Sequence, residues 1–446
     1  MNRQLRLLAV PGIALSIALA AGPGALAAEQ LAGPAQDETV WITLGADAFA
    51  VAESLFPPGS LRESLQPLDE ADGVVLTRIP RSAIPDLSER IHDELLRCGG
   101  FVFHPSEEDG RAAMARVRNP PQPLGALPFT IDQPALVAAV AGGVSESQFL
   151  ATLTALSTNF PNRYHAHHAV HHSADWIRDL WAGYAAGRPE VTVELYAHPA
   201  GTTPQPSVIL TIPGTALPGE VVVLGAHQDS TRSNGSCSSS TCIAPGADDD
   251  GSGIAALSEV IRIAMSTNFQ PQRTVQFMGY AAEEVGLRGS HDIAGDYLQA
   301  GMNVVAVFQL DMIGYKGSVE DIVMITDRTD PELTNFVELL IDTYFPDLVR
   351  GTTACGYGCS DHSAWNQRGF RAVFPFESRM NQFNPQYHTA NDTVAGISAA
   401  HAVKFARLAA AFLVETGIDG GGPLPPEIFA DGFESGNTSA WSASFP

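Results

Sequence analysis

Histidine and acidic side chains follow successive apolar runs of this chain, at the points where strands would end. The runs 221–225, 274–280 and 304–310 are each followed by such residues. Others stand just before a helix-like segment or in a later loop, and the set is His227, Asp229, Asp248, Asp249, Asp250, Glu283, Glu284, Asp311 and His388. Because ligands bind outside the carboxyl ends of the strands in open α/β sheets, we expect these side chains to lie together. A packing requirement alone does not place charged residues in this way.

The chemistry that these residue types favour is metal binding. Imidazole and carboxylate ligands together suit zinc, and sites that hold two metal ions often share one bridging carboxylate. In the pair Glu283-Glu284, one carboxylate could bind metal while the other acts as a general base. In His227-Gln228-Asp229, the aspartate could hold the histidine in orientation. Any one of these residues alone would be a solvated acid on a loop, but the whole set predicts a metal site.

Strands and helices alternate between residues 127 and 417. Strands are predicted at 191–195, 207–211, 221–225, 274–278 and 304–308, and helices at 253–265 and near 290–299. The continuous apolar run 221–225 is typical of a strand buried on both faces. The alternation predicts an α/β domain in which helices flank a mostly parallel central sheet.

The ends of the chain differ in composition from this middle part. Residues 1–28 combine two arginines, an apolar run and a small-residue exit, which predicts a signal peptide and a secreted protein, extracellular or periplasmic, without a membrane span in its mature form. Residues 29–126 end in a proline-rich joint and are predicted to be a smaller α+β propeptide; an N-terminal domain that stays attached is the alternative. Residues 418–446 are predicted to be a linker and C-terminal tail.

The charge of the chain excludes some partners. Lys and Arg number 25 against 49 Asp and Glu, a formal net charge of −24. This acidity argues against binding to nucleic acid or to anionic lipid. Hydrophobic residues make up 45% of the chain, which permits a large buried core.

Two groups of residues remain outside this pattern. Among five cysteines, the close pairs Cys237/Cys242 and Cys355/Cys359 predict small disulfide loops in an oxidising compartment, with free thiols or a metal knuckle as alternatives, and Cys98 is left over. Residues 165–172 hold five histidines, some spaced by four as in helical metal sites. We interpret that segment as a solvated or pH-sensitive surface.

Several motifs also carry a family resemblance. They are Gly-Ala-His-Gln-Asp-Ser-Thr at 225–231, Ala-Pro-Gly-Ala-Asp-Asp-Asp-Gly-Ser-Gly-Ile-Ala-Ala at 244–256, Ala-Ala-Glu-Glu-Val-Gly-Leu-Arg-Gly-Ser at 281–290, Gln-Leu-Asp-Met at 309–312, Cys-Gly-Tyr-Gly-Cys-Ser-Asp-His at 355–362, and Pro-Phe-Glu-Ser at 375–378, which leads to His388-Thr389. With them the chain resembles the zinc aminopeptidases of peptidase family M28, closest to the secreted bacterial leucyl aminopeptidases of the Vibrio and Aeromonas type. The likeness runs from about 127 to 417.

The resemblance implies a zinc-exopeptidase fold with two zinc ions. Position by position, it implies that Asp249 bridges the two ions. His227 and Asp311 would complete one site, and Glu284 and His388 the other.

The resemblance also implies roles beside the metal ions. Glu283 would be the general base and Asp229 the residue that orients His227. Cys355 and Cys359 would form a disulfide beside the active site, with Tyr357 near the reacting carbonyl. Metal coordination lowers the pKa of water from about 15.7 to roughly 7, so that Glu283 could take up its proton at neutral pH.

An apolar pocket for the first side chain of the substrate is implied as well. The matching positions are Met312, Ile325, Tyr357, Phe374, Phe376, Met380, Phe383 and Tyr387, which suit Leu, Phe or Met, although such residues often fill core instead. The expected protein is therefore a monomeric aminopeptidase acting on peptides with a free N-terminus. The alternatives are a glutaminyl cyclase, which typically uses one zinc, another exopeptidase such as a carboxypeptidase or dipeptidase, and an inactive peptide-binding relative.

Overall fold

The structure is a computed structural model that describes residues 38–56, 65–95, 100–119, 127–167, 172–232, 237, 241–356 and 358–418. The predicted signal peptide, Cys98, Tyr357 and the tail from 419 onward lie outside these described residues.

A six-stranded sheet forms the centre of the part from residue 127 onward. Its strand order is β12-β9-β7-β8-β6-β5. The bounds are β5 Thr192–Tyr196, β6 Ser207–Ile212, β7 Leu217–His227, β8 Arg273–Tyr280, β9 Asn303–Gln309 and β12 Ala372–Val373. β12, β9, β7 and β8 pair in parallel, whereas β6 pairs antiparallel with β8 and with β5. The predicted α/β class is confirmed.

The antiparallel edge is the part of the sheet that departs from the parallel pairing that we predicted for most of it. β5 and β6 lie within one residue of the predicted strands, but residues 197–206 between them contain no helix. A parallel pair needs a crossover of a dozen or more residues, usually helical. The short connection therefore forces these two strands to run in opposite directions.

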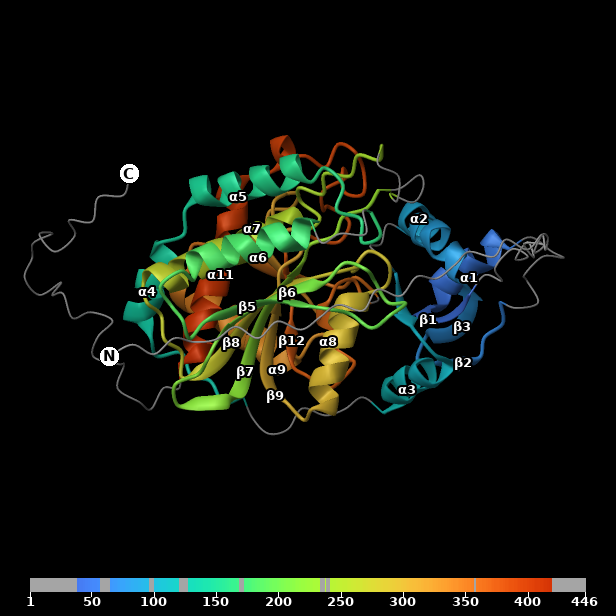
Figure 1. Ribbon diagram of the computed structural model, residues 1–446, viewed down its shortest axis with the longest axis horizontal. Helices are drawn as coiled ribbons and strands as arrows, with labels where there is room; N and C mark the ends of the chain where they lie inside the picture. The colour runs from blue at the N-terminus through green and yellow to red at the C-terminus, as the bar shows by residue number, and fades with distance from the viewer. Residues whose placement is uncertain are drawn as a thin grey trace, which may run out of the picture. The chain divides into compact units, whose positions relative to one another are not determined.

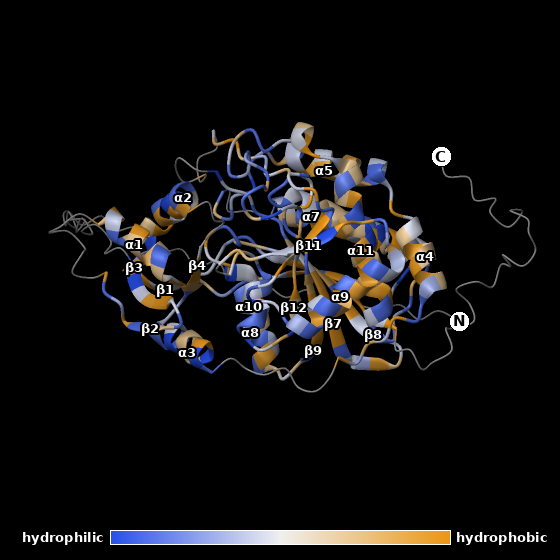
Figure 2. Cartoon of the chain, turned by 180° about the vertical axis from the view of Figure 1, so that it is seen from behind, coloured by the Kyte–Doolittle hydropathy of each residue, from blue (hydrophilic) through white to orange (hydrophobic). Residues whose placement is uncertain are grey.

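Strand β7 shows why the sheet is buried on both faces. Val221 and Val223 belong to one apolar core, while Val222, Leu224 and Ala226 belong to another on the opposite face. Because successive side chains of a strand point to opposite faces, a continuous apolar run serves both cores. Figure 2 shows the strands of this sheet coloured as hydrophobic.

Helices cover both faces of the sheet. The larger core takes up apolar side chains from α4 Pro134–Gly142, α5 Glu146–Asn159, α6 His172–Tyr184, α7 Gly251–Ser266, α9 Pro331–Tyr344 and α11 Ala399–Gly417. The core on the other face takes them up from α8 Arg288–Gln299 and α10 His362–Asn366. In Figure 1, α4, α5, α6 and α11 are seen along one side of the strands.

A second, smaller sheet was not predicted. It consists of β10 Ile322–Ile325, β11 Arg350–Thr353 and β13 Pro375–Phe376, in the order β11-β10-β13, and a short 3-10 helix, η3 Val394–Gly396, follows later in the chain. Strands of two to four residues are too short to give a clear periodic signal.

Residues 38–119 form an α+β arrangement, as predicted. The elements are β1 Thr39–Gly45, α1 Ala46–Leu55, β2 Asp69–Ala71, β3 Val74–Pro80, η2 Arg81–Ala83, α2 Ile84–Leu95, β4 Phe101–His104 and α3 Glu107–Arg118. The sheet order is β2-β3-β1-β4, with antiparallel pairing throughout. Its core also includes Tyr164, Ala282 and Val285 from later in the chain.

The predicted cysteine pairs are disulfides in the structure, Cys237–Cys242 and Cys355–Cys359. Within the described ranges, no single helix has the length and hydropathy of a membrane span. One helix pair, α4 with α5, passes that test together, with a bend of 53° between them.

The larger core generates a prediction about stability. Phe308 on β9 and Phe412 on α11 are fully buried, with ring centroids 4.8 Å apart. Replacing Phe412 by alanine should lower the free energy of unfolding by about 3–5 kcal/mol, because apolar surface is lost and a cavity remains. Urea titration measures the change. Leu339→Ala on α9, where the side chain is 54% exposed, should change it little; equal losses in the two variants would contradict this account of the core.

Candidate metal centre

Three parallel strands deliver the predicted ligands to one edge of the sheet. β7 ends at His227, Glu283 and Glu284 follow β8, and Asp311 lies two residues beyond β9. β7 lies between β8 and β9, so the carboxyl ends of all three are neighbours. The expected convergence of these side chains is what the structure has.

Only the middle one of three consecutive aspartates faces the histidines. Asp248 accepts hydrogen bonds from the backbone N–H of Gly314 and from the Asn384 amide, both at 2.8 Å. Asp250 caps α7 by accepting from Gly253 N at 2.8 Å, and its other oxygen accepts from His227 N at 3.0 Å. The outer two carboxylates therefore fix the backbone and leave Asp249 to the site.

Asp249 joins two groups of possible ligands. Its Oδ1 lies 3.0 Å from Nε2 of His227, and its Oδ2 lies 3.1 Å from Nε2 of His388. His227 Nε2 is 3.5 Å from Asp311 Oδ1, and His388 Nε2 is 2.7 Å from Glu284 Oε2. Each group therefore has three ligand atoms within 4.8 Å of one another, and all five side chains are buried.

Asp229 supports both the histidine and the glutamate pair. His227 Nδ1 lies 3.2 Å from the Asp229 carbonyl oxygen and 3.5 Å from its carboxylate. The same carboxylate accepts from the backbone N–H groups of Glu283 at 3.0 Å and Glu284 at 3.3 Å. The sequence suggested only the first of these contacts; the second links the β7 end to the loop after β8.

Glu283 lies in this site without a partner among the described residues. Both of its carboxylate oxygens are buried, and neither has a hydrogen-bond partner there. Burial raises the pKa of Glu283 well above its usual value; nearby His227 lowers it and nearby Glu284 raises it further. A carboxyl group with a raised pKa suits proton transfer near neutral pH.

Charges in the site are strongly coupled. Burial and the neighbouring Asp249 raise the pKa of Glu284 to about 7. Burial also acts to raise the pKa of Asp249, but hydrogen bonds with His227 and His388 outweigh it and lower that pKa. Since metal ions bind deprotonated ligands, cations would displace the protons shared here. Converging buried carboxylates and imidazoles fit a pair of divalent cations.

The backbone is strained at three points of contact with the site. Ala282, Met312 and His388 have φ values of 57°, 51° and 53°, in the left-handed region that non-glycine residues seldom adopt. Ala282 precedes Glu283, Met312 follows Asp311, and His388 is itself a candidate ligand. Such conformations are typical of sites whose geometry is fixed by the surrounding structure.

One buried acid in the site was missed by the sequence analysis. Asp392 accepts from Asp248 N at 3.0 Å and from Asp249 N at 3.1 Å, so it holds the backbone that carries the shared carboxylate. The available signal was its position four residues after His388, in His-Thr-Ala-Asn-Asp.

The residues implied for the substrate pocket form one small apolar cluster. It consists of Met312, Ile325, Cys355, Cys359, Phe374, Phe376 and Tyr387, with Met380 and Phe383 packed against it. Aromatic contacts lead through it, with ring centroids 4.9 Å apart for Phe383 and Tyr387, and 4.7 Å for Tyr387 and His388. The cluster is separate from the main core and reaches the candidate metal ligands. Tyr357 lies outside the described residues.

The histidine-rich segment differs from its interpretation as solvated surface. His165 and His167 lie in a turn and His172 begins α6, while His168 and His171 lie outside the described residues. His167 is buried, and its backbone N–H donates to Tyr164 O. The interpretation as solvated surface is therefore wrong for His167.

The chain is similar in sequence to known proteins. The model of peptidase family M28 matches residues 207–413. A probable leucine aminopeptidase of Arthroderma benhamiae is 33% identical over 328 residues, covering 73% of this chain and 87% of the relative. Leucine aminopeptidase 1 of Arthroderma otae is 36% identical over 308 residues, covering 66% and 80%. These relatives are fungal, which replaces the narrower expectation of a Vibrio or Aeromonas type.

Solved structures agree with the sequence comparisons. LapB from Legionella pneumophila superposes with a TM-score of 0.72 at 29% identity, covering 85% of this chain and 100% of that one. The LapA aminopeptidase of the same organism gives 0.71 at 26% identity, covering 85% and 99%. The family model matches residues 207–413, and a leucine aminopeptidase relative is 33% identical over 87% of its own length. The chain therefore belongs to peptidase family M28.

Proposed function

We propose that the protein is a secreted aminopeptidase that uses two zinc ions to remove a large hydrophobic residue, such as leucine, from the N-terminus of peptides. The observation that carries the proposal is the sharing of Asp249 between two buried ligand groups, with Glu283 beside them. Two relatives named as leucine aminopeptidases support the reaction.

The donor set favours zinc over harder cations. His227, Asp249 and Asp311 would hold one ion, and Asp249, Glu284 and His388 the other. Mixed imidazole and carboxylate ligands suit zinc, whereas magnesium and calcium prefer oxygen ligands alone. Zinc ions held here would supply Lewis-acid activation of water and of the scissile carbonyl at neutral pH.

The residues of the chain would handle the protons. Glu283, with both oxygens free of described hydrogen bonds, would accept a proton from the attacking water and pass it to the leaving amine. Asp229 would keep both Glu283 and His227 in place through the contacts described above. For Tyr357 we propose a role in stabilising the oxyanion, as the family resemblance implies.

The apolar cluster supports a preference for leucine or a similar residue. It includes Met312 and Tyr387, which adjoin the candidate ligands Asp311 and His388 in the chain. A substrate whose first carbonyl lies at the metal site could therefore place its first side chain against these apolar groups.

Hydrolysis of a leucine anilide by processed protein tests the proposal. We expect activity that is lost on chelation and restored by zinc, while the N-acetylated anilide stays intact, because the enzyme would act on a free N-terminus. Release of aniline is followed by absorbance. Activity that survives complete removal of metal, or equal cleavage of the acetylated substrate, would contradict the proposal.

A substitution of Glu283 separates proton transfer from metal binding. Glu283→Gln should lower turnover of the anilide by about 10²–10⁴-fold while the zinc content stays the same, because the amide keeps the shape but cannot accept the proton. Steady-state kinetics and elemental analysis measure the two quantities. Glu194→Gln, an exposed site on β5, is the matched control; a Glu283→Gln protein as active as this control would refute the assignment.

We further propose that residues 29–126 are a propeptide. The described part of this region contacts the loop that carries the glutamate pair: Ser88 Oγ donates to Glu284 O at 3.2 Å, and Phe103 N donates to Gly286 O at 3.2 Å. A segment packed on this loop could restrain the site until it is removed.

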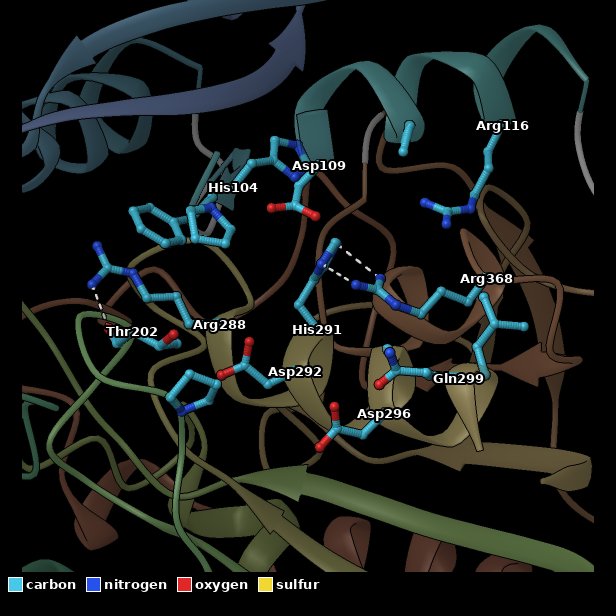
Figure 3. A pocket seen from close by; sticks show the side chains of 16 residues that line it. His104, Asp109, Arg116, Thr202, Arg288, His291, Asp292, Asp296, Gln299 and Arg368 are labelled. Atoms are coloured by element: carbon cyan, nitrogen blue, oxygen red, sulfur yellow. Dashed lines mark hydrogen bonds between the residues drawn. The ribbon is translucent and has the colours of Figure 1, made fainter. Parts of the chain in front are cut away.

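The boundary of this region also contains a cavity of about 380 Å³, shown in Figure 3. His104 and Asp109 line it from the N-terminal side, and His291, Asp292 and Arg368 from the other. Arg368 donates to His291 Nδ1 at 2.6 Å, drawn as a dashed line. This part of the boundary is polar and incompletely filled, in contrast to the apolar contacts with Ala282 and Val285. Polar contacts are typical of transient interfaces, which supports release of the segment.

Processing of the secreted protein tests the propeptide proposal. N-terminal sequencing should give a mature chain that begins near residue 127, and cleavage there should raise the rate of anilide hydrolysis over that of the uncut chain. A fully active protein that begins at Glu29 would contradict the proposal.

A further inference from the structure

Arg163 is a fully buried arginine between two loops that carry candidate metal ligands. Its side chain has 0% exposure. It donates three hydrogen bonds, from Nε to Gln228 O at 2.7 Å, and from its two terminal nitrogens to Pro245 O at 2.5 Å and Gly246 O at 2.7 Å. All three acceptors are backbone carbonyl oxygens on those two loops.

These carbonyl groups stand next to the ligands. Gln228 lies between His227 and Asp229, and Gly246 lies three residues before Asp249. The Gly246 carbonyl also accepts from Gly251 N at 3.0 Å, which closes the short loop that contains Asp249 onto the start of α7. One planar guanidinium group therefore joins the His227 loop to the Asp249 loop, beside the hydrogen bond from His227 N to the Asp250 carboxylate.

Ser230 strengthens the same connection. Arg163 N donates to Ser230 Oγ at 3.1 Å, and this hydroxyl donates to Ala244 O at 2.8 Å. The packing is tight: a Cβ added at Gly246, where φ is +48°, would lie 2.3 Å from Asp249 O and 2.9 Å from a terminal nitrogen of Arg163. Neither loop can shift without breaking these contacts.

The charge of Arg163 fits the acidic site without occupying it. Burial lowers the pKa of Arg163, while the charges of Asp392 and Asp229 act to raise it. The positive charge of the guanidinium offsets the mutual repulsion of the ligand carboxylates. Because the group donates its hydrogen bonds to carbonyl groups, the carboxylate oxygens stay available to cations. An arginine paired directly with Asp249 would instead compete with metal.

We propose that Arg163 is a positioning residue that sets the zinc affinity of this centre by holding the His227 and Asp249 loops at the spacing that both ions require. The inference rests on the zinc site proposed above. Without the guanidinium, zinc would have to order the two loops as it binds, and that cost would be subtracted from the affinity.

Arg163→Lys tests the proposal because it keeps the charge and removes the fork. A lysine ammonium is a point charge and cannot reach three carbonyl groups in the plane of a guanidinium. We expect zinc to bind about 10–100-fold more weakly, as for other residues that orient metal ligands. Competition with a chromophoric chelator measures this affinity in the folded protein. With zinc saturating, KM for the leucine anilide should stay within about twofold, since Arg163 is not in the apolar cluster.

A matched variant distinguishes positioning from general stability. Arg273 is also buried, with 2% exposure, but lies at the start of β8, at the opposite end from the site, where it pairs with Glu220 at 2.6 Å. Arg273→Lys should lower the thermal unfolding midpoint and leave zinc affinity unchanged. Ser230→Ala is a smaller change in the same connection and should also weaken zinc binding. It tests the proposal if Arg163→Lys does not fold.

The outcomes separate this inference from the proposed function. Wild-type affinity for zinc in folded Arg163→Lys, or in Ser230→Ala if the first variant does not fold, would overturn the positioning role. Equal weakening of zinc binding by Arg273→Lys would also overturn the positioning role. A wild-type protein that binds no zinc would instead overturn the proposed function itself.

Discussion

The burial of many carboxylates at one sheet edge is the constraint on which the rest of the structure depends. Asp249, Glu283, Glu284 and Asp311 are each at most 2% exposed, and they lie around a single pair of histidines. Buried charges of one sign are costly unless they are paired, protonated or bound to metal. A site of this kind persists only where the surrounding fold holds it together against repulsion, and cations relieve that repulsion.

The fold meets this constraint mainly through the backbone. Parallel strands bring His227, the glutamate loop and Asp311 to neighbouring positions. Two carboxylates outside the ligand groups accept backbone N–H groups: Asp229 from the glutamate pair, and Asp250 from His227 and from the start of α7. Arg163 holds the backbone through its carbonyl groups, to which the guanidinium donates hydrogen bonds. The ligands are thus fixed by their main chains, which leaves their side-chain oxygens for chemistry.

The sequence could predict strands and helices that have a clear pattern of apolar residues, and site residues that directly follow such a strand. The run 221–225 predicted a strand buried on both faces, and His227 directly after it marked the edge where the site lies. The antiparallel direction of β5 and β6 depends on the absence of a helix between them, and β10, β11 and β13 are too short for a periodic signal. Arg163 and Asp392 act through hydrogen bonds to distant backbone groups, and such contacts have no periodic pattern in the sequence. Only the position of Asp392, four residues after His388, gave a signal. The choice of Asp249 among three aspartates came from the family resemblance, and the hydrogen bonds of Asp248 and Asp250 give its physical reason.

Anomalous diffraction from crystals of the zinc-loaded protein, measured at the zinc absorption edge, would show whether two ions share Asp249. We expect two anomalous peaks, each about 2.0–2.2 Å from its nitrogen and oxygen ligands, and both in contact with Asp249. His227 and Asp311 should adjoin one peak, and Glu284 and His388 the other. A single peak, or two peaks that do not share Asp249, would contradict a centre of two ions bridged by this residue.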